Sequence, residues 1–145
     1  MNPSRILPDL QCSLLCEEVR REANGNFFIL GIIDYIVVPQ LPIVAHKLFV
    51  FNRWTAGLGQ FTECVRLLGP DQALIRKTEV KFGLRDPREN GTTVSVFGQL
   101  EFKTPGTYYV EVLVDEVMKL RYAVNVAIVP PQTQQPGAPS EAPGA

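Results

Sequence analysis

The chain has 145 residues and a mass of 16.1 kDa, and with 46% hydrophobic and 20% charged residues it has enough apolar material for the core of one domain. Its 14 lysines and arginines are balanced by 15 aspartates and glutamates, which gives a formal net charge of -1. Such a chain has no basic field that would attract a phosphate backbone, so we expect no nucleic-acid partner.

The N-terminal region does not have the pattern of a secretion signal. The first 22 residues, MNPSRILPDLQCSLLCEEVRRE, contain two prolines and an aspartate before any apolar stretch of useful length. The longest apolar run, FFILGII at residues 27–33, is much shorter than the roughly 20 residues of a membrane-spanning helix. We therefore expect a cytoplasmic protein with no membrane insertion.

The segment at residues 13–24 has two interpretations. Its glutamates and arginines, followed by an Asn-Gly pair, suit a helix with a C-terminal cap, and the same pair also suits a hairpin turn between two strands. We favour a strand, because two sets of side chains alternate, Cys12, Leu14 and Cys16 with Ser13, Leu15 and Glu17. On a strand, Cys12 and Cys16 lie about 13 Å apart, which is beyond disulfide reach. We therefore expect small buried thiols in a reducing compartment.

Short runs rich in valine, isoleucine and phenylalanine continue along the chain, separated by turn residues. The runs lie at residues 26–34, 46–54, 60–68, 73–82 and 93–102. In the fourth run Lys77, Glu79 and Lys81 share one face, as they do in a protected edge strand. This spacing predicts an all-β fold, an antiparallel immunoglobulin-like β-sandwich of roughly seven to nine strands within residues 1–129.

Residues 103–129 have the clearest hairpin pattern in the chain. Each arm has one fully apolar face, as packing against a core requires; the faces are Tyr108, Val110, Val112 and Val114, then Leu120, Tyr122, Val124, Val126 and Ile128. Tyr108 follows Gly106 in the manner of the tyrosine corner of immunoglobulin-type sandwiches, and the alternative is an ordinary strand tyrosine. Beyond Val129, the sequence PPQTQQPGAPSEAPGA predicts a flexible tail at residues 130–145.

The first half of the chain has more apolar surface than a two-layer fold needs. Both faces of residues 26–34 and of residues 46–54 are apolar, so these strands require a second cover. We expect residues 37–45 or residues 6–10 to supply part of that cover, and a protein partner or a second copy to supply the rest. The predicted partner interface consists of Phe28, Leu30, Phe49, Phe51, Arg53 and Trp54.

Few residues suggest chemistry. The one histidine, His46, has no companion at a metal-ligand spacing, and Cys64 has no neighbouring base. The carboxylates of Glu17 and Glu18 would point to opposite faces of a strand and cannot share a substrate. We expect no cofactor, no metal and no catalytic site, and hence a non-catalytic interaction or structural module. The alternative is a small-ligand or carbohydrate-binding sandwich that uses Trp54 and its aromatic neighbours, although a tryptophan in a sandwich more commonly belongs to the core.

A family resemblance adds to this interpretation. The strings LLCEEVRREANGNFFILGIIDYIVVPQLP, LFVFNRW, FTECVRLLGPD and GTYYVEVLVD resemble a group of small bacterial proteins known only as a domain of unknown function. The resemblance covers about residues 14–126 and implies a bacterial single-domain β-sandwich, with no catalytic residue to transfer. The chain departs from the family pattern at two turn positions where we expect glycine, Gln72 and Glu116, so these turns are expected to bend differently.

Overall fold

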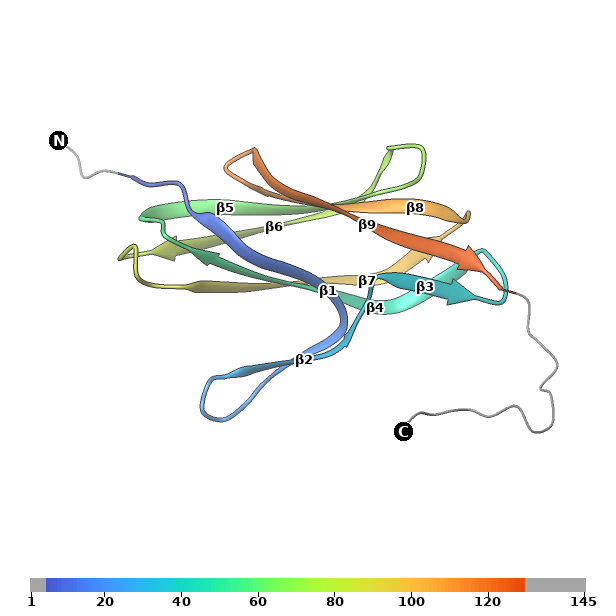
Figure 1. The fold of residues 1–145 in the computed structure, drawn as a ribbon, viewed down its shortest axis with the longest axis horizontal. Coiled ribbons are helices and arrows are strands. Elements are labelled where there is room, and N and C mark those ends of the chain that lie inside the picture. Colours follow the sequence, from blue (N-terminus) through green and yellow to red (C-terminus); the bar gives the residue numbers. More distant parts are fainter. Residues whose placement is uncertain (1–4, 130–145) are drawn as a thin grey trace, which may run out of the picture.

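The structure is a computed structural model that describes residues 5–129, and the predicted tail at residues 130–145 lies outside the described residues. Every regular element within residues 5–129 is a β-strand (Figure 1). The strands are β1 (Asp9–Arg21), β2 (Phe27–Ile32), β3 (Tyr35–Val38), β4 (Ile43–Thr55), β5 (Gly59–Leu68), β6 (Leu74–Leu84), β7 (Gly91–Phe102), β8 (Gly106–Val114) and β9 (Val117–Ile128). The prediction of an all-β chain is confirmed, and so is the strand at residues 13–21.

The strands form two layers. A four-stranded sheet has the order β2-β1-β4-β7, and a five-stranded sheet has the order β3-β9-β8-β5-β6. All pairs are antiparallel except β3 with β9. If β2 and β3 are set aside, seven strands remain. Of these, β1, β4 and β7 form one sheet, and β5, β6, β8 and β9 form the other. This is the arrangement of an immunoglobulin-type sandwich in which β6, the fourth of the seven strands, pairs with β5, the third.

The core lies between the sheets and contains one of the two predicted hairpin faces in full. Tyr108, Val110, Val112 and Val114 of β8 are all buried, as the alternation indicates. On β9 the prediction holds for Val124 and Val126, which are buried, but not for Leu120 and Ile128, which are exposed. The Tyr108 hydroxyl donates a 2.7 Å hydrogen bond to the backbone carbonyl of Thr104, so the tyrosine corner is confirmed. This bond anchors the start of β8 to the preceding loop.

The two turn positions expected to hold glycine have the backbone conformation that glycine favours. Gln72 has a φ of 70° and Glu116 a φ of 69°, both in the left-handed region. Both positions therefore adopt a conformation that costs a residue other than glycine backbone free energy. Glu116 shares its two-residue hairpin loop with Asp115, whose φ is 47°, so both central residues have the signs of a type I′ turn.

The long strand β1 changes its pairing partner along its length. β1 pairs with β4 up to Cys16, and from Cys16 onward it pairs with β2 instead. Residues 17–32 therefore form a hairpin, called here the β1–β2 hairpin, which ends the four-stranded sheet at β2 and projects away from β4 and β7 (Figure 1). Its turn contains Gly25 with a φ of 92° and is closed by a hydrogen bond from the Gly25 N–H to the Glu22 carbonyl. The predicted hairpin at the Asn-Gly pair is thus confirmed, but its turn is not the two-residue type I′ turn that this pair suggested, because Asn24 does not have a positive φ and five residues separate the paired Arg21 and Phe27.

Candidate functional site

The β1–β2 hairpin covers part of the outer face of the four-stranded sheet. The ring of Phe27 packs edge-on against Phe51, with 5.6 Å between ring centroids and an interplanar angle of 70°. Phe51 is buried as a result. The prediction that residues 37–45 or 6–10 provide this cover is wrong, because Leu7, Leu10, Leu41 and Ile43 instead pack against the core between the sheets.

The residues of the predicted interface separate into three groups. Phe28 and Leu30 are 43% and 42% exposed, whereas Phe49 and Arg53 are half-buried and Phe51 is buried. Trp54 is 0% exposed, because it points to the core side of β4. Its indole stacks on Phe82 at 5.5 Å, so it contributes neither to a surface nor to an aromatic platform. Phe28 and Leu30 are therefore the exposed apolar members of the predicted set.

Trp54 belongs to a buried polar cluster that the sequence analysis missed. One carboxylate oxygen of Glu63, Oε2, accepts hydrogen bonds from Trp54 Nε1 at 2.8 Å, from Asn52 Nδ2 at 2.8 Å and from Thr93 Oγ1 at 2.6 Å. The signal was present in β5, since Glu63 alternates in register with the core residues Phe61 and Val65. The cluster links β4, β5 and β7 across the core, and it fixes the orientation of the indole.

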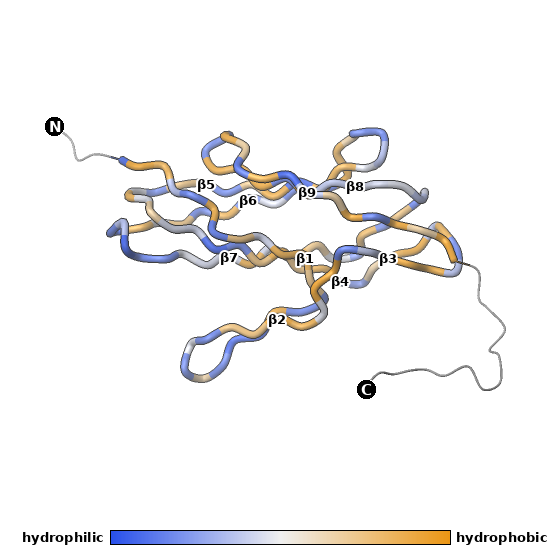
Figure 2. Tube along the Cα trace, viewed as in Figure 1, coloured by the Kyte–Doolittle hydropathy of each residue, from blue (hydrophilic) through white to orange (hydrophobic). Residues whose placement is uncertain are grey.

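The edge of the four-stranded sheet at β2 is unusual. β2 pairs with β1 on one side, and no strand within residues 5–129 pairs with its other side. Its six residues, FFILGI, carry no charge, and Figure 2 colours this strand toward the hydrophobic end of the scale. The exposed side chains on it are Phe28, Leu30 and Ile32. By contrast β6, an edge of the other sheet, carries the charged row that was predicted for a protected edge, Lys77, Glu79 and Lys81.

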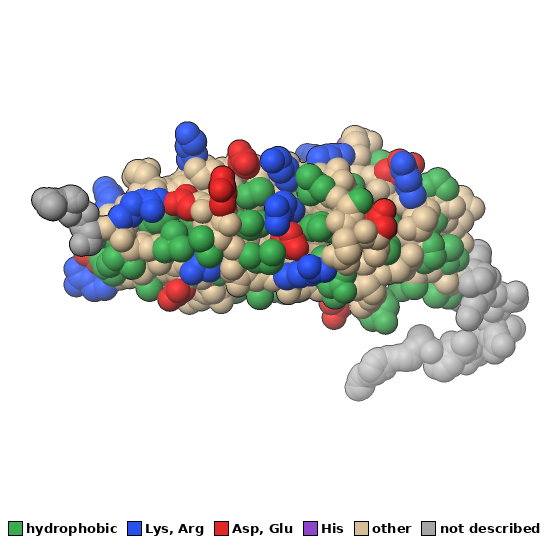
Figure 3. Space-filling model, turned by 90° about the horizontal axis from the view of Figure 1, so that it is seen from above, with side chains coloured by type: hydrophobic (Ala, Val, Ile, Leu, Met, Phe, Trp, Pro, Cys, Tyr) green, Lys and Arg blue, Asp and Glu red, His purple; other side chains and the backbone are tan. Residues whose placement is uncertain are grey.

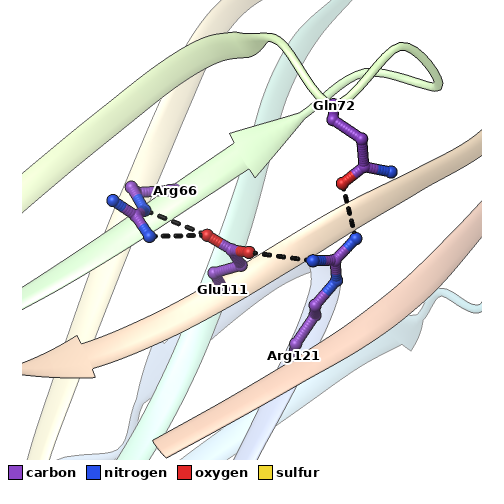
Figure 4. Close-up of polar contacts among 4 residues, drawn as sticks. All are labelled: Arg66, Gln72, Glu111 and Arg121. Atoms are coloured by element: carbon purple, nitrogen blue, oxygen red, sulfur yellow. Dashed lines mark hydrogen bonds and ion pairs between the residues drawn. The ribbon is translucent and has the colours of Figure 1, made fainter. Parts of the chain in front are cut away.

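The outer face of the five-stranded sheet has charged side chains of both signs scattered over it (Figure 3). At its centre, Glu111 of β8 is buried between Arg66 of β5 and Arg121 of β9, at 2.8 Å and 3.4 Å (Figure 4). Arg121 also donates to Gln72 Oε1 at 2.6 Å and lies 4.0 Å from the centroid of the Tyr109 ring. The charges of these side chains are neutralised by one another. We therefore interpret the row as cross-strand ion pairs that hold β5, β8 and β9 in register.

The candidate chemical groups are not assembled into a reactive centre. His46 is exposed, and its Nδ1 lies 2.9 Å from Gln99 Nε2. Cys12, Cys16 and Cys64 are free thiols, and desolvation raises the pKa of Cys16 and of Cys64, which disfavours the nucleophilic thiolate. Within residues 5–129, no group of three or more histidine, cysteine, aspartate or glutamate side chains is placed to hold a metal ion. The same residues include no helix long and apolar enough to span a membrane.

A family model described as "Family of unknown function (DUF6941)" matches residues 11–127. No curated protein matches the chain. Among solved structures, the chain is similar to a CARDB domain from Pyrococcus furiosus solved in complex with di-metal ions, with 17% identity, coverage of 88% of this chain and 100% of that one, and a TM-score of 0.43. It is also similar to an immunoglobulin-like protein from Pseudomonas aeruginosa, with 14% identity, coverage of 86% and 99%, and a TM-score of 0.40.

Proposed function

The chain belongs to DUF6941, a family of unknown function, and we propose that it is a non-catalytic interaction module that pairs with a strand of another polypeptide along the free edge of β2. The observation that carries this proposal is an uncharged apolar edge strand. A free edge presents unpaired backbone N–H and C=O groups, and proteins usually block such an edge with lysine, proline or inward-pointing charge. β2 has none of these residues.

The side chains of β2 support the same function. Phe28 and Leu30 are 43% and 42% exposed, and Ile32 is 61% exposed. An added strand would extend the four-stranded sheet and cover these side chains, while its backbone would satisfy the free edge. Burying one such side chain fully is worth about 1.5–3 kcal/mol. The exposed fractions mean that each residue has roughly half of that free energy still to gain.

We propose a second copy of the chain as the occupant. In a two-fold symmetric pair, β2 would lie antiparallel to β2, and each residue of FFILGI would face an apolar residue or glycine of the other copy. No like charges would meet, because the strand has no charge. A self-complementary edge of this kind is what an isologous interface requires.

The experiment is a mass measurement by light scattering, on protein separated by size, over a range of concentrations. We expect the wild-type chain to form a dimer in the micromolar range and Leu30→Lys to be monomeric, because a lysine on the edge opposes strand pairing. Leu74→Lys is the matched control, since Leu74 is a 53% exposed leucine on β6, the edge strand that already carries charge. It should dimerise like the wild type.

Two outcomes would contradict the proposal. One is a wild-type chain that stays monomeric into the high micromolar range, where an interface of micromolar affinity would be occupied. The other is a Leu30→Lys variant that is folded and still dimeric, because self-association would then use a different surface. Circular dichroism of both variants establishes that they keep the β-sheet signal of the wild type.

A further inference from the structure

We propose that the groove between the β1–β2 hairpin and the four-stranded sheet binds an organic anion. In this site, the guanidinium groups of Arg21 and Arg53 hold the oxyanion, and the rings of Phe27 and Phe51 contact the apolar part of the ligand. The inference goes beyond the proposed function, because the groove and the free edge of β2 are different surfaces. Phe27 and Ile29 of β2 line the groove, whereas the alternating residues Phe28 and Leu30 do not.

The groove has the size of a ligand site. Its volume is about 890 Å³, and sites for small molecules usually have volumes of about 300–1,000 Å³. One wall is the hairpin, with Arg21 and Phe27, and the floor is the outer face of the sheet, with Phe51, Arg53 and Thr92. Apolar rings beside a few polar groups are the usual composition of such sites.

The charge of the groove is unbalanced. Arg21 and Arg53 both line it, and its lining residues include no aspartate or glutamate. Within residues 5–129, neither arginine forms an ion pair, although most other arginines of that range do. A planar guanidinium presents a fork of N–H donors that matches a carboxylate or a phosphate. The ligand that complements this site is therefore an oxyanion.

Arg53 provides an independent sign of a missing acceptor. Its Nε is buried and has no hydrogen-bond partner among the described residues. A buried donor without a partner costs about 1–3 kcal/mol, and more when the group is charged. The described residues therefore leave part of the Arg53 guanidinium unsatisfied, and because Nε itself is closed to solvent, an oxyanion in the groove would pair with the terminal nitrogens of the same group. The cross-strand neighbours of Arg53, Cys12 and Thr92, also line the groove, so the guanidinium belongs to its floor.

Arg21 is held beside the apolar part of the same site. Its guanidinium carbon lies 4.8 Å from the centroid of the Phe27 ring, and its Nε donates a 3.3 Å hydrogen bond to the Gly25 carbonyl. This bond uses Nε and leaves the terminal nitrogens for a ligand. Because Phe27 packs on Phe51, charge and aromatic surface adjoin in one groove. A ligand with an oxyanion next to an apolar group matches both features, and inorganic phosphate would match only one.

The test is a calorimetric titration of the full chain with benzoate, phenyl phosphate and, as a neutral analogue, benzyl alcohol. We expect saturable binding of at least one anion and at least tenfold weaker binding of benzyl alcohol. Arg21→Gln and Arg53→Gln should each weaken anion binding at least tenfold. The control is Arg20→Gln, since Arg20 precedes Arg21 in β1 but its guanidinium is paired with Glu18 at 3.0 Å. This variant should bind like the wild type.

Each result of these titrations either supports or overturns the anion site. Binding of benzoate alone or of phenyl phosphate alone supports the site and identifies the carboxylate or the phosphate as its ligand. The absence of saturable binding for both anions overturns the proposal, and so does equal binding by the wild type and Arg21→Gln. Arg21 is exposed, so its variant should fold even if Arg53→Gln does not. The oligomeric state of the wild type does not affect these readings, because the groove and the β2 edge are tested by different substitutions.

Discussion

Replacing Glu116 by glycine should stabilise the fold. Glu116 is the second residue of the two-residue loop between β8 and β9 and has a φ of 69°. The left-handed conformation costs a residue other than glycine about 1–2 kcal/mol. Glycine loses more backbone entropy on folding, which opposes the gain by about 0.5–1 kcal/mol. The net stabilisation by Glu116→Gly is then roughly 0.5–1 kcal/mol.

The structure offers no compensating loss at this position. The Glu116 side chain is exposed and forms no hydrogen bond or ion pair with any described residue. The substitution also creates an Asp-Gly pair, the sequence that type I′ hairpin loops prefer. Urea unfolding should show a higher midpoint at an unchanged slope, and thermal unfolding should show a midpoint higher by about 2–5 °C.

The control is Ala123→Gly in β9. Ala123 is exposed within a strand and pairs with Tyr109, so glycine there gains no relief and should cost about 0.5–1 kcal/mol. If Glu116→Gly destabilised the protein as much as Ala123→Gly does, the left-handed strain assigned to the loop would be refuted. Equal stability of Glu116→Gly and the wild type would show that the two opposing effects are of the same size, which contradicts the magnitude given above.

Three further predictions test other parts of the structure. Trp54 is the only tryptophan and is fully buried, so its fluorescence should be blue-shifted and resist quenching by acrylamide; strong quenching in folded protein would contradict its position. Tyr108→Phe should cost about 0.5–1.5 kcal/mol in urea unfolding through the lost hydrogen bond to Thr104, and no loss would remove the tyrosine corner as a stabilising element. Hydrogen bonds from Arg5 and from the Thr62 N–H lower the pKa of Asp115, so its contribution to stability is present above the ordinary aspartate pKa of about 3.9 and is lost as pH falls through the lowered value. The difference in unfolding free energy between wild type and Asp115→Asn should therefore stay constant above about pH 5 and shrink in more acidic solution, and a difference that grew on acidification would contradict this assignment.

The alternation of side chains was sufficient to predict much of the fold. A strand has a period of two, so the buried face of β8, the charged edge of β6 and the turn at Gly25 are all local patterns. The glycine expected at Gln72 and Glu116 came from the family resemblance, and only the structure showed that both residues nevertheless adopt the left-handed conformation. None of these features depends on which strands become neighbours.

Much less of the candidate sites could be predicted from the sequence. Trp54 was assigned to a surface because β4 is apolar on both faces, and alternation alone does not decide which face meets the core. In the structure the indole N–H donates to the carboxylate of Glu63 on the buried side of β5, and these two residues come into contact only when the sheets stack. Similarly, Phe51 is covered by the ring of Phe27, which belongs to the β1–β2 hairpin. No local sequence pattern predicts that this hairpin lies over the sheet.

The sequence by itself therefore determined most of the strands, the main turns and the class of the fold, because these follow from short-range periodicity and backbone preference. It missed β3 and the first residues of β4, where two prolines interrupt the pattern. Tertiary structure alone decided that β1 leaves β4 at Cys16 to pair with β2, that β3 lies parallel to β9, and that Arg21 and Arg53 share one groove. The physical reason is that strand pairing and layer packing join residues far apart in the chain. Many such pairings satisfy the same alternating pattern, and only the packing of the whole core selects one of them.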